Sequence, residues 1–244
     1  MSDAIVMNAL AKTYPGGQRA LNDLTLSVRE GEIFGFLGPN GAGKTTTIKI
    51  LLGLLSATSG DVRVLGGSPA DPETRQQVGY LPEVANYYEF MNIRELLRFY
   101  GALCGMSAQD IRKRTEEMLE LTGLTEHVRK PLKTYSKGML QRAGIAQSLF
   151  HDPDLLILDE PTTGLDPLAR IEVREVMRCL REAGKTVFFS SHELSEAETV
   201  CDRVGILKEG VLRWCGPTSE VVGTGERNLE RVFLDIIGDG ENRK

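Results

Sequence analysis

The sequence predicts an α/β fold: a mostly parallel sheet flanked by helices, with an antiparallel β subdomain at the N-terminus and an α-helical insert. Continuous apolar runs at residues 33 to 37, 155 to 158 and 187 to 189 alternate with helical patterns. Strands buried on both faces of a parallel sheet have this pattern. Residues 21 to 28 alternate apolar and polar, and residues 4 to 10 resemble a weaker strand. These two segments predict the antiparallel layer.

The helical insert is expected at about residues 84 to 150. This region contains three helical patterns and no convincing strand. Two of the helices are expected to begin at capping pairs, Asn92 with Glu95 and Ser107 with Asp110. The last helix of the insert is expected to lead back to the sheet.

The elements after the insert complete one domain over residues 1 to 244. Asp166 followed by Pro167 predicts a helix start, with an N-cap and a proline at the first helical position. A short pair of strands is expected within residues 203 to 214. A short C-terminal helical extension is expected over about residues 217 to 244.

Composition and charge narrow the function classes. The chain has 244 residues, 41% of them hydrophobic and 26% charged, which is typical of a globular domain. Its net charge of −5 gives no basic footprint, so no nucleic-acid partner is expected. The four cysteines show no CxxC spacing and predict reduced cytosolic thiols. No signal peptide is evident, and no apolar run approaches the roughly 18 to 20 residues that span a bilayer. Any membrane role must therefore come through a partner.

The most specific motif is a phosphate-binding loop between a predicted buried strand and a predicted helix. Residues 38 to 45 satisfy GxxxxGK[ST]: Gly38, Pro39, Asn40, Gly41, Ala42, Gly43, Lys44 and Thr45. Glycines let backbone N–H groups curl around phosphate oxygens, and the helix N-terminus adds positive potential. Lys44 would neutralise the β- and γ-phosphates, and Thr45 would give its hydroxyl to Mg²⁺. With Thr46 as a further contact, the motif predicts a P-loop NTPase core that binds a nucleoside triphosphate.

Three polar residues follow two other predicted buried strands. Asp159 and Glu160 end the run at residues 155 to 158, and strand ends are often acidic. Next to a phosphate loop, however, a carboxylate at this position is what Mg²⁺ coordination requires. We therefore expect Asp159 to act on the metal and Glu160 to polarise the attacking water as general base. His192 follows the strand at residues 187 to 189, where it is either a capping or core residue or a group that reaches the γ-phosphate.

At this point the sequence resembles the nucleotide-binding domains of ABC transporters, in order over nearly the whole chain. Residues 38 to 45 resemble the Walker A loop, residues 155 to 159 the Walker B strand, and Glu160 the catalytic glutamate. The resemblance implies that Tyr14 stacks on adenine. It also identifies residues 164 to 166, ending in Asp166, as the D-loop and His192 as the switch histidine.

The signature loop of the family is usually Leu-Ser-Gly-Gly-Gln. Here the segment reads Tyr135-Ser136-Lys137-Gly138-Met139. The resemblance implies that Ser136, Lys137, Gly138, Met139 and Asp166 contact the nucleotide held by the opposite subunit. Lys137 and Met139 replace Gly and Gln, a form similar to the ABC-2-type exporter branch, whose ATPase and membrane subunits are separate chains. Lys137 either adds positive charge near the γ-phosphate or is solvated.

A second departure from the family pattern is Glu83, where most members have a glutamine that contacts Mg²⁺ and relays to the membrane subunit. A carboxylate would be a stronger Mg²⁺ ligand, and Tyr-Leu-Pro-Glu at residues 80 to 83 also resembles the exporter branch. The alternative is an exposed glutamate after a proline turn.

The resemblance implies an ATPase with ATP and Mg²⁺ as cofactors, acting as a head-to-tail dimer of two copies around two Mg-ATP. It implies separate transmembrane permease subunits, and a cytoplasmic location, peripheral on the inner face of the cell membrane. Export is the expected direction, with an importer subunit as the alternative. ABC-type proteins that act on DNA or ribosomes carry long coiled-coil insertions or fused ATPase domains, which this sequence lacks. A simple GTPase or nucleotide kinase is disfavoured because no Asn-Lys-x-Asp motif occurs.

Overall fold

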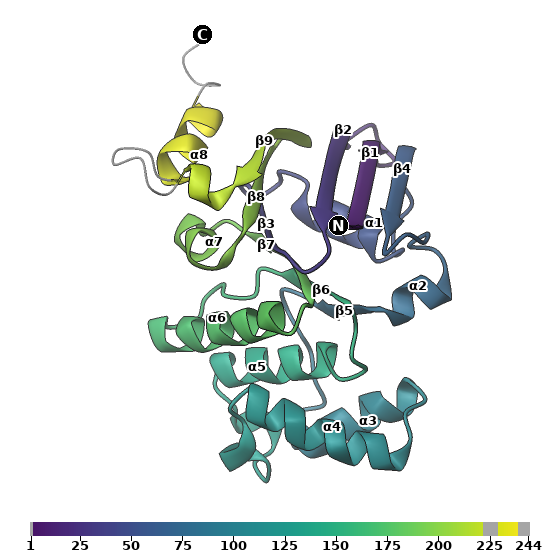
Figure 1. Ribbon diagram of the computed structural model, residues 1–244, viewed down its shortest axis with the longest axis vertical. Coiled ribbons are helices and arrows are strands. Elements are labelled where there is room, and N and C mark those ends of the chain that lie inside the picture. Colours follow the sequence, from purple (N-terminus) through teal and green to yellow (C-terminus); the bar gives the residue numbers. More distant parts are fainter. Residues whose placement is uncertain (1, 222–228, 239–244) are drawn as a thin grey trace.

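The computed structural model describes residues 2 to 221 and 229 to 238, and shows two sheets with helices on both sides (Figure 1). The main sheet has the strand order β5-β6-β7-β3-β8-β9, and all neighbouring pairs except β8 and β9 are parallel. Its strands are β5 (Val78–Leu81), β6 (Leu155–Asp159), β7 (Thr186–Ser191), β3 (Ile33–Leu37), β8 (Arg203–Lys208) and β9 (Val211–Pro217). The predicted mostly parallel sheet is confirmed.

The three apolar runs that predicted buried strands form the centre of this sheet. Strands β3, β6 and β7 are buried along their whole length. In the parallel register, Leu37 lies beside Ser191 and Asp159 lies beside Ser190. The carboxyl ends of the three strands therefore share one edge of the sheet, and the loops after them meet there.

A second, antiparallel sheet has the order β2-β1-β4, with β1 (Asp3–Thr13), β2 (Arg19–Arg29) and β4 (Ser59–Val64). Strands β1 and β2 confirm the predicted antiparallel layer. The sequence pattern did not predict β4 or β5. Strand β4 is largely exposed and polar, and β5 has only four residues, so neither shows a clear period-two pattern.

The two faces of the main sheet pack against different layers. Phe34, Phe36 and Phe188 point towards α1 (Lys44–Leu51) and the antiparallel sheet. The aromatic rings of Phe34 and Phe188 stack with their centroids 5.9 Å apart. Alternate residues such as Phe189 pack against α5 (Lys137–Ser148), α6 (Pro167–Glu182) and α7 (Leu194–Val200). This three-layer packing fixes the loops at the sheet edge.

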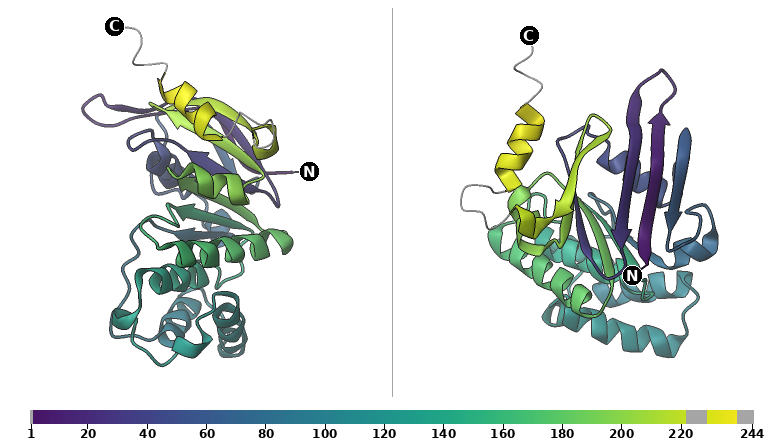
Figure 2. Two further views of the ribbon diagram at one scale, coloured as in Figure 1. Left: turned by 90° about the vertical axis from the view of Figure 1, so that its left-hand side faces the viewer. Right: turned by 45° about the horizontal axis from the view of Figure 1, so that its top comes forward.

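Helices α3 (Ile93–Leu103), α4 (Ala108–Leu121) and α5 lie within the range predicted for the helical insert. They occupy the end of the molecule opposite the antiparallel sheet (Figure 2). Asn92 and Glu95 form the predicted capping box at α3, and the Ser107 hydroxyl accepts the Asp110 N–H at α4. The smaller elements are α2 (Pro72–Gln76), η1 (Thr125–His127) and η2 (Leu132–Thr134).

The predicted C-terminal extension is described in part. It contains η3 (Thr218–Glu220) and α8 (Leu229–Gly238), whereas residues 222 to 228 and 239 to 244 lie outside the described residues. In the part of the chain that the structure describes, no helix has both the length and the apolar character needed to cross a bilayer.

Candidate active site

A cavity of about 360 Å³ lies at the sheet edge where β3, β6 and β7 end. It brings together the predicted phosphate loop, Tyr14, Glu83, Glu160 and His192. Its walls also include four residues that the sequence pattern did not single out, Gln18, Arg19, Ala20 and Thr163. The antiparallel layer and the main sheet, which come from distant parts of the sequence, thus contribute to one site.

The phosphate loop has the backbone that anion binding needs. Helix α1 begins at Lys44, and its N-cap Gly43 (φ 111°) provides no side chain to accept the first amide groups. These N–H groups and the helix dipole make the loop a natural phosphate site. A Cβ on Gly43 would lie 2.7 Å from the carbonyl oxygen of Ala20, and one on Gly38 would lie 2.4 Å from that of Leu207. Only glycine allows this close packing.

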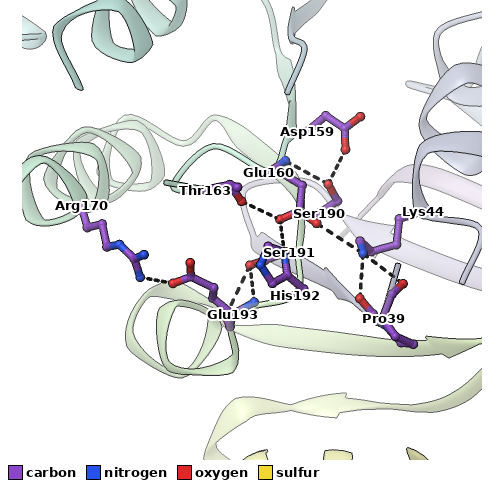
Figure 3. A network of polar contacts seen from close by, with 11 residues as sticks. Pro39, Lys44, Asp159, Glu160, Thr163, Arg170, Ser190, Ser191, His192 and Glu193 are labelled. Atoms are coloured by element: carbon purple, nitrogen blue, oxygen red, sulfur yellow. Dashed lines mark hydrogen bonds and ion pairs between the residues drawn. The ribbon is translucent and has the colours of Figure 1, made fainter. Parts of the chain in front are cut away.

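Lys44 and Glu160 form a buried ion pair inside the cavity wall. The Lys44 Nζ lies 3.3 Å from Glu160 Oε1 and donates to the carbonyl oxygen of Gly38 at 2.7 Å. The other carboxylate oxygen of Glu160, Oε2, lies 2.7 Å from His192 Nδ1 and accepts the Thr163 hydroxyl at 2.9 Å (Figure 3). Both groups predicted to be catalytic, Glu160 and His192, are therefore in direct contact.

The backbone of Glu160 is unusual. Its φ of 52° lies in the left-handed region, which costs a non-glycine residue of order 1 kcal/mol or more. This conformation turns the chain sharply at the end of β6 and directs Glu160 towards the cavity. The contacts with Lys44, Thr163 and His192 hold the side chain in that position.

Asp159, beside it, is buried, does not line the cavity and is held by a serine. The Ser190 hydroxyl donates to Asp159 Oδ1 at 2.6 Å and accepts the Glu160 N–H at 3.0 Å. Burial raises the pKa of Asp159, and hydrogen bonds from Ser190 and Thr45 oppose that rise. The Thr45 hydroxyl and the Asp159 carboxylate are thus neighbours, as two ligands of one Mg²⁺ would be.

The expected metal ligands do not form a preformed acidic cage. Within the described ranges, no group of three His, Cys, Asp or Glu side chains is placed to hold a metal ion. Mg²⁺ is usually held by one or two carboxylates together with phosphates and water, so Asp159 and Thr45 fit this mode. Glu83 is exposed and lines the same cavity, and it also borders a second hollow of about 230 Å³ beside α5.

Tyr14 is half-buried at the wall of the cavity. Its hydroxyl lies 3.2 Å from the Thr46 hydroxyl, so the ring is anchored to the phosphate loop segment. An aromatic ring held beside a phosphate loop offers a surface on which a base can stack.

The predicted signature residues lie outside this cavity. Ser136 is the N-cap of α5 and accepts the Met139 N–H at 3.2 Å. Ser136 and Lys137 are exposed, whereas Gly138 is buried where an added Cβ would lie 2.6 Å from the Ala169 side chain. Asp166 is the N-cap of α6, as predicted. These residues therefore do not line the cavity formed at the phosphate loop of their own chain.

Comparison with known proteins gives the family. A family profile described as "ABC transporter" matches residues 21 to 163. An uncharacterized ABC transporter ATP-binding protein of Synechocystis is 48% identical over 209 residues, which is 85% of this chain and 59% of that protein. Nod factor export ATP-binding protein I of Ralstonia nicotianae is 40% identical over 206 residues, or 84% of this chain and 64% of that one. The chain thus spans less than two thirds of the length of either relative.

A solved structure described as the ATP-binding subunit of an ABC transporter agrees in fold over almost the whole chain. It superposes with a TM-score of 0.85 at 30% identity and covers 96% of this chain and 99% of its own. The resemblance to ABC transporter ATP-binding domains and the fold predicted from the sequence are confirmed. The chain belongs to the ABC transporter family, as an ATP-binding subunit.

Proposed function

We propose that this chain binds Mg-ATP between two copies of itself, hydrolyses it, and drives export through separate membrane subunits. One observation carries the proposal. The phosphate loop, Glu160 and His192 share one cavity, while the signature segment from Ser136 to Met139 lies outside it. Each chain therefore offers half of a site, and a second copy arranged head to tail supplies the other half.

The first half binds and positions the reacting groups. Backbone N–H groups at the start of α1 and the Lys44 ammonium hold the β- and γ-phosphates. A phosphate competes with Glu160 for Lys44, since both are anions. Once freed from Lys44, Glu160 can accept a proton from the attacking water while His192 Nδ1 orients its Oε2. Bound at Thr45 and Asp159, with Glu83 at the cavity wall, Mg²⁺ would offset negative charge on the phosphates.

The second half closes over the γ-phosphate. Ser136 and Lys137 are exposed at the N-terminus of α5, where the helix dipole favours an anion. Asp166 lies at the end of the D-loop, where it is the N-cap of α6. Two docked copies would place these groups against each other's nucleotide, so hydrolysis would weaken the interface by removing charge.

The membrane subunit would dock on the segment from Glu83 to about Arg98, which carries exposed apolar side chains. Val84 is 70% and Phe90 is 75% exposed. Tyr88 packs edge-on against Phe99, with ring centroids 5.8 Å apart, and extends this apolar surface. Contiguous exposed apolar groups indicate a protein interaction site. Docking there would hold the chain on the cytoplasmic face of the membrane, and the exporter relative supports export as the direction.

Two variants test the nucleotide sandwich. Glu160→Gln should keep ATP binding but block hydrolysis, so gel filtration with Mg-ATP should show a dimer. Adding Lys44→Ala to this variant should restore the monomer, because the phosphates lose their main cation. A monomer at saturating ATP in Glu160→Gln would contradict the sandwich. Unchanged ATPase activity in Lys44→Ala alone would contradict the phosphate-loop assignment.

The docking surface has its own test. Phe90→Asp places a charge in the exposed apolar segment and should abolish co-purification with the membrane subunit while ATP binding persists. Leu54→Asp is the control, because Leu54 is 68% exposed but follows α1, away from the docking segment and from Asp166. Equal retention of both variants would place the permease elsewhere. Transport into inverted membrane vesicles would confirm export, whereas transport out of them would indicate an importer.

A further inference from the structure

We infer that Arg170 is a positioning residue that couples the D-loop to the switch histidine. The inference rests on the proposed ATPase function and extends it to a residue on α6 that the motifs do not include. Arg170 lies one turn after Asp166 and contacts both the D-loop and the residue next to His192. Its guanidinium thereby joins the loop expected to face the second copy to the histidine that contacts Glu160.

The contacts of Arg170 are specific. Its Nε donates to the carbonyl oxygen of Leu165 at 3.0 Å, within the D-loop. Its Nη1 donates to Glu193 Oε2 (Figure 3). The same atom lies 3.8 Å from Glu196 Oε1. The Arg170 and Glu193 side chains are 27% and 20% exposed, so the pair is shielded from much of the solvent. A pair of this kind is held more firmly than one on the open surface.

Arginine is the side chain suited to this task. Its planar guanidinium donates in fixed directions, so one group can hold a backbone carbonyl and a carboxylate at a set distance. A lysine ammonium is a flexible point charge and would keep the attraction to Glu193 without fixing the D-loop carbonyl. The geometry, rather than the charge alone, makes the connection.

The connection continues from Glu193 to the reacting groups. The Glu193 N–H donates to the Ser191 hydroxyl at 2.9 Å, so the backbone on both sides of His192 is anchored. His192 itself is exposed, and its Nδ1 contacts Glu160 Oε2. With Ser191 fixed at the end of buried β7, the Arg170 contact sets the other side of the histidine. A shift of Leu165 would move Glu193, and with it the imidazole.

The same helix provides a matched control. Arg174 lies one turn further along α6, and its Nε is 3.6 Å from Glu196 Oε2. Arg174→Gln removes the same charge from the same helix and also affects Glu196. It leaves the contacts of Arg170 with Leu165 and Glu193 in place.

The test compares steady-state ATPase kinetics of the 244-residue chain in five variants: Arg170→Gln, Arg170→Lys, Glu193→Ala, the Arg170→Gln/Glu193→Ala double variant and Arg174→Gln. Arg170→Gln and Glu193→Ala should lower kcat by about tenfold with little change in the KM for ATP. Arg170→Lys should recover only part of kcat. Because both side chains act through one contact, the double variant should be no slower than the slower single variant. Arg174→Gln should stay within about twofold of the parent chain.

Three results would overturn the inference: a kcat for Arg170→Gln equal to that of Arg174→Gln, a loss confined to KM, or multiplicative losses in the double variant. Thermal unfolding checks that each variant folds. If Arg170→Gln does not fold, the kcat values of Arg170→Lys and Glu193→Ala decide whether the inference holds. In the Glu160→Gln background, Arg170→Gln should still form the ATP-bound dimer, whereas a merely structural defect would weaken it. An inactive parent chain would instead contradict the proposed function.

Discussion

The Ser190 hydroxyl satisfies two buried groups at once, and its removal has a calculable cost. It donates to the Asp159 carboxylate and accepts the Glu160 N–H, and all three residues are buried. Ser190→Ala leaves both partners without this contact in a site too tightly packed to rearrange freely. We expect the variant to be less stable and to bind Mg²⁺ more weakly, because the loss also raises the pKa of Asp159 further.

The magnitude follows from these two contacts. A hydrogen bond to a charged group contributes about 1.5 to 3 kcal/mol, and an unsatisfied buried donor costs about 1 to 3 kcal/mol. Because one hydroxyl makes both contacts, we take the lower part of the combined range, about 3 kcal/mol. For a chain of this length that corresponds to a fall in Tm of about 6 to 12 °C.

Ser148→Ala is the matched control. Ser148 is also fully buried, but its hydroxyl donates only to the carbonyl oxygen of Ile145, which also accepts the Leu149 N–H. Its loss leaves no buried group without a partner and should cost about 1 kcal/mol. Unfolding in urea, without nucleotide and with EDTA, measures both variants. Equal free energies of unfolding for Ser190→Ala and Ser148→Ala would refute the reasoning.

Two further predictions concern the proposed metal ligands. Burial raises the pKa of Asp159 in the folded chain. The stability that this group contributes is therefore fully present below its unfolded-state pKa of about 3.9. That stability is lost as the pH rises through the folded-state pKa. Asp159→Asn should therefore have a higher Tm than the parent chain at pH 7, and this difference in Tm should shrink towards pH 4. The variant should also lose Mg²⁺-dependent ATPase activity. A difference in Tm that does not change with pH would contradict the role of the buried carboxylate. Glu83→Gln should bind ATP normally but need more Mg²⁺ for half-maximal ATPase activity, and superimposable Mg²⁺ titrations would instead support an exposed glutamate with no role at the metal.

The sequence predicted the centre of this fold because its central strands are buried on both faces. Such strands are continuous apolar runs, and polar residues at their ends mark the sheet edge. Strand β5 escaped prediction because four residues carry too little pattern, and its place beside β6 is set by tertiary pairing. The contact between Glu160 and His192 was not predicted, but it follows from the parallel register of β6 and β7, which brings the ends of these two strands together.

The residues that support the site were harder to predict. Ser190 had one visible signal, a hydroxyl residue inside an otherwise apolar buried strand, which must find a partner. Arg170 had none, because charged residues on helices are usually solvated. Only the tertiary structure shows that its guanidinium contacts the Leu165 carbonyl before α6 and Glu193 at the start of α7. Thr163 and Gln18 reach the cavity from loops, and Arg19 and Ala20 reach it from the first residues of β2; no local pattern fixes the paths of these segments.

The contacts of Glu160 suggest why the proposed base is built on a strained backbone. Its left-handed φ costs stability, and the surrounding contacts with Lys44, Thr163 and His192 offset that cost. One of these three partners, Lys44, is also the residue that a γ-phosphate attracts most strongly. Nucleotide binding would thus remove one support from Glu160 and leave its carboxylate with His192 and Thr163, directed at the cavity. The general base would then be released by the substrate it acts on, and the Arg170 contact would set how firmly His192 holds it.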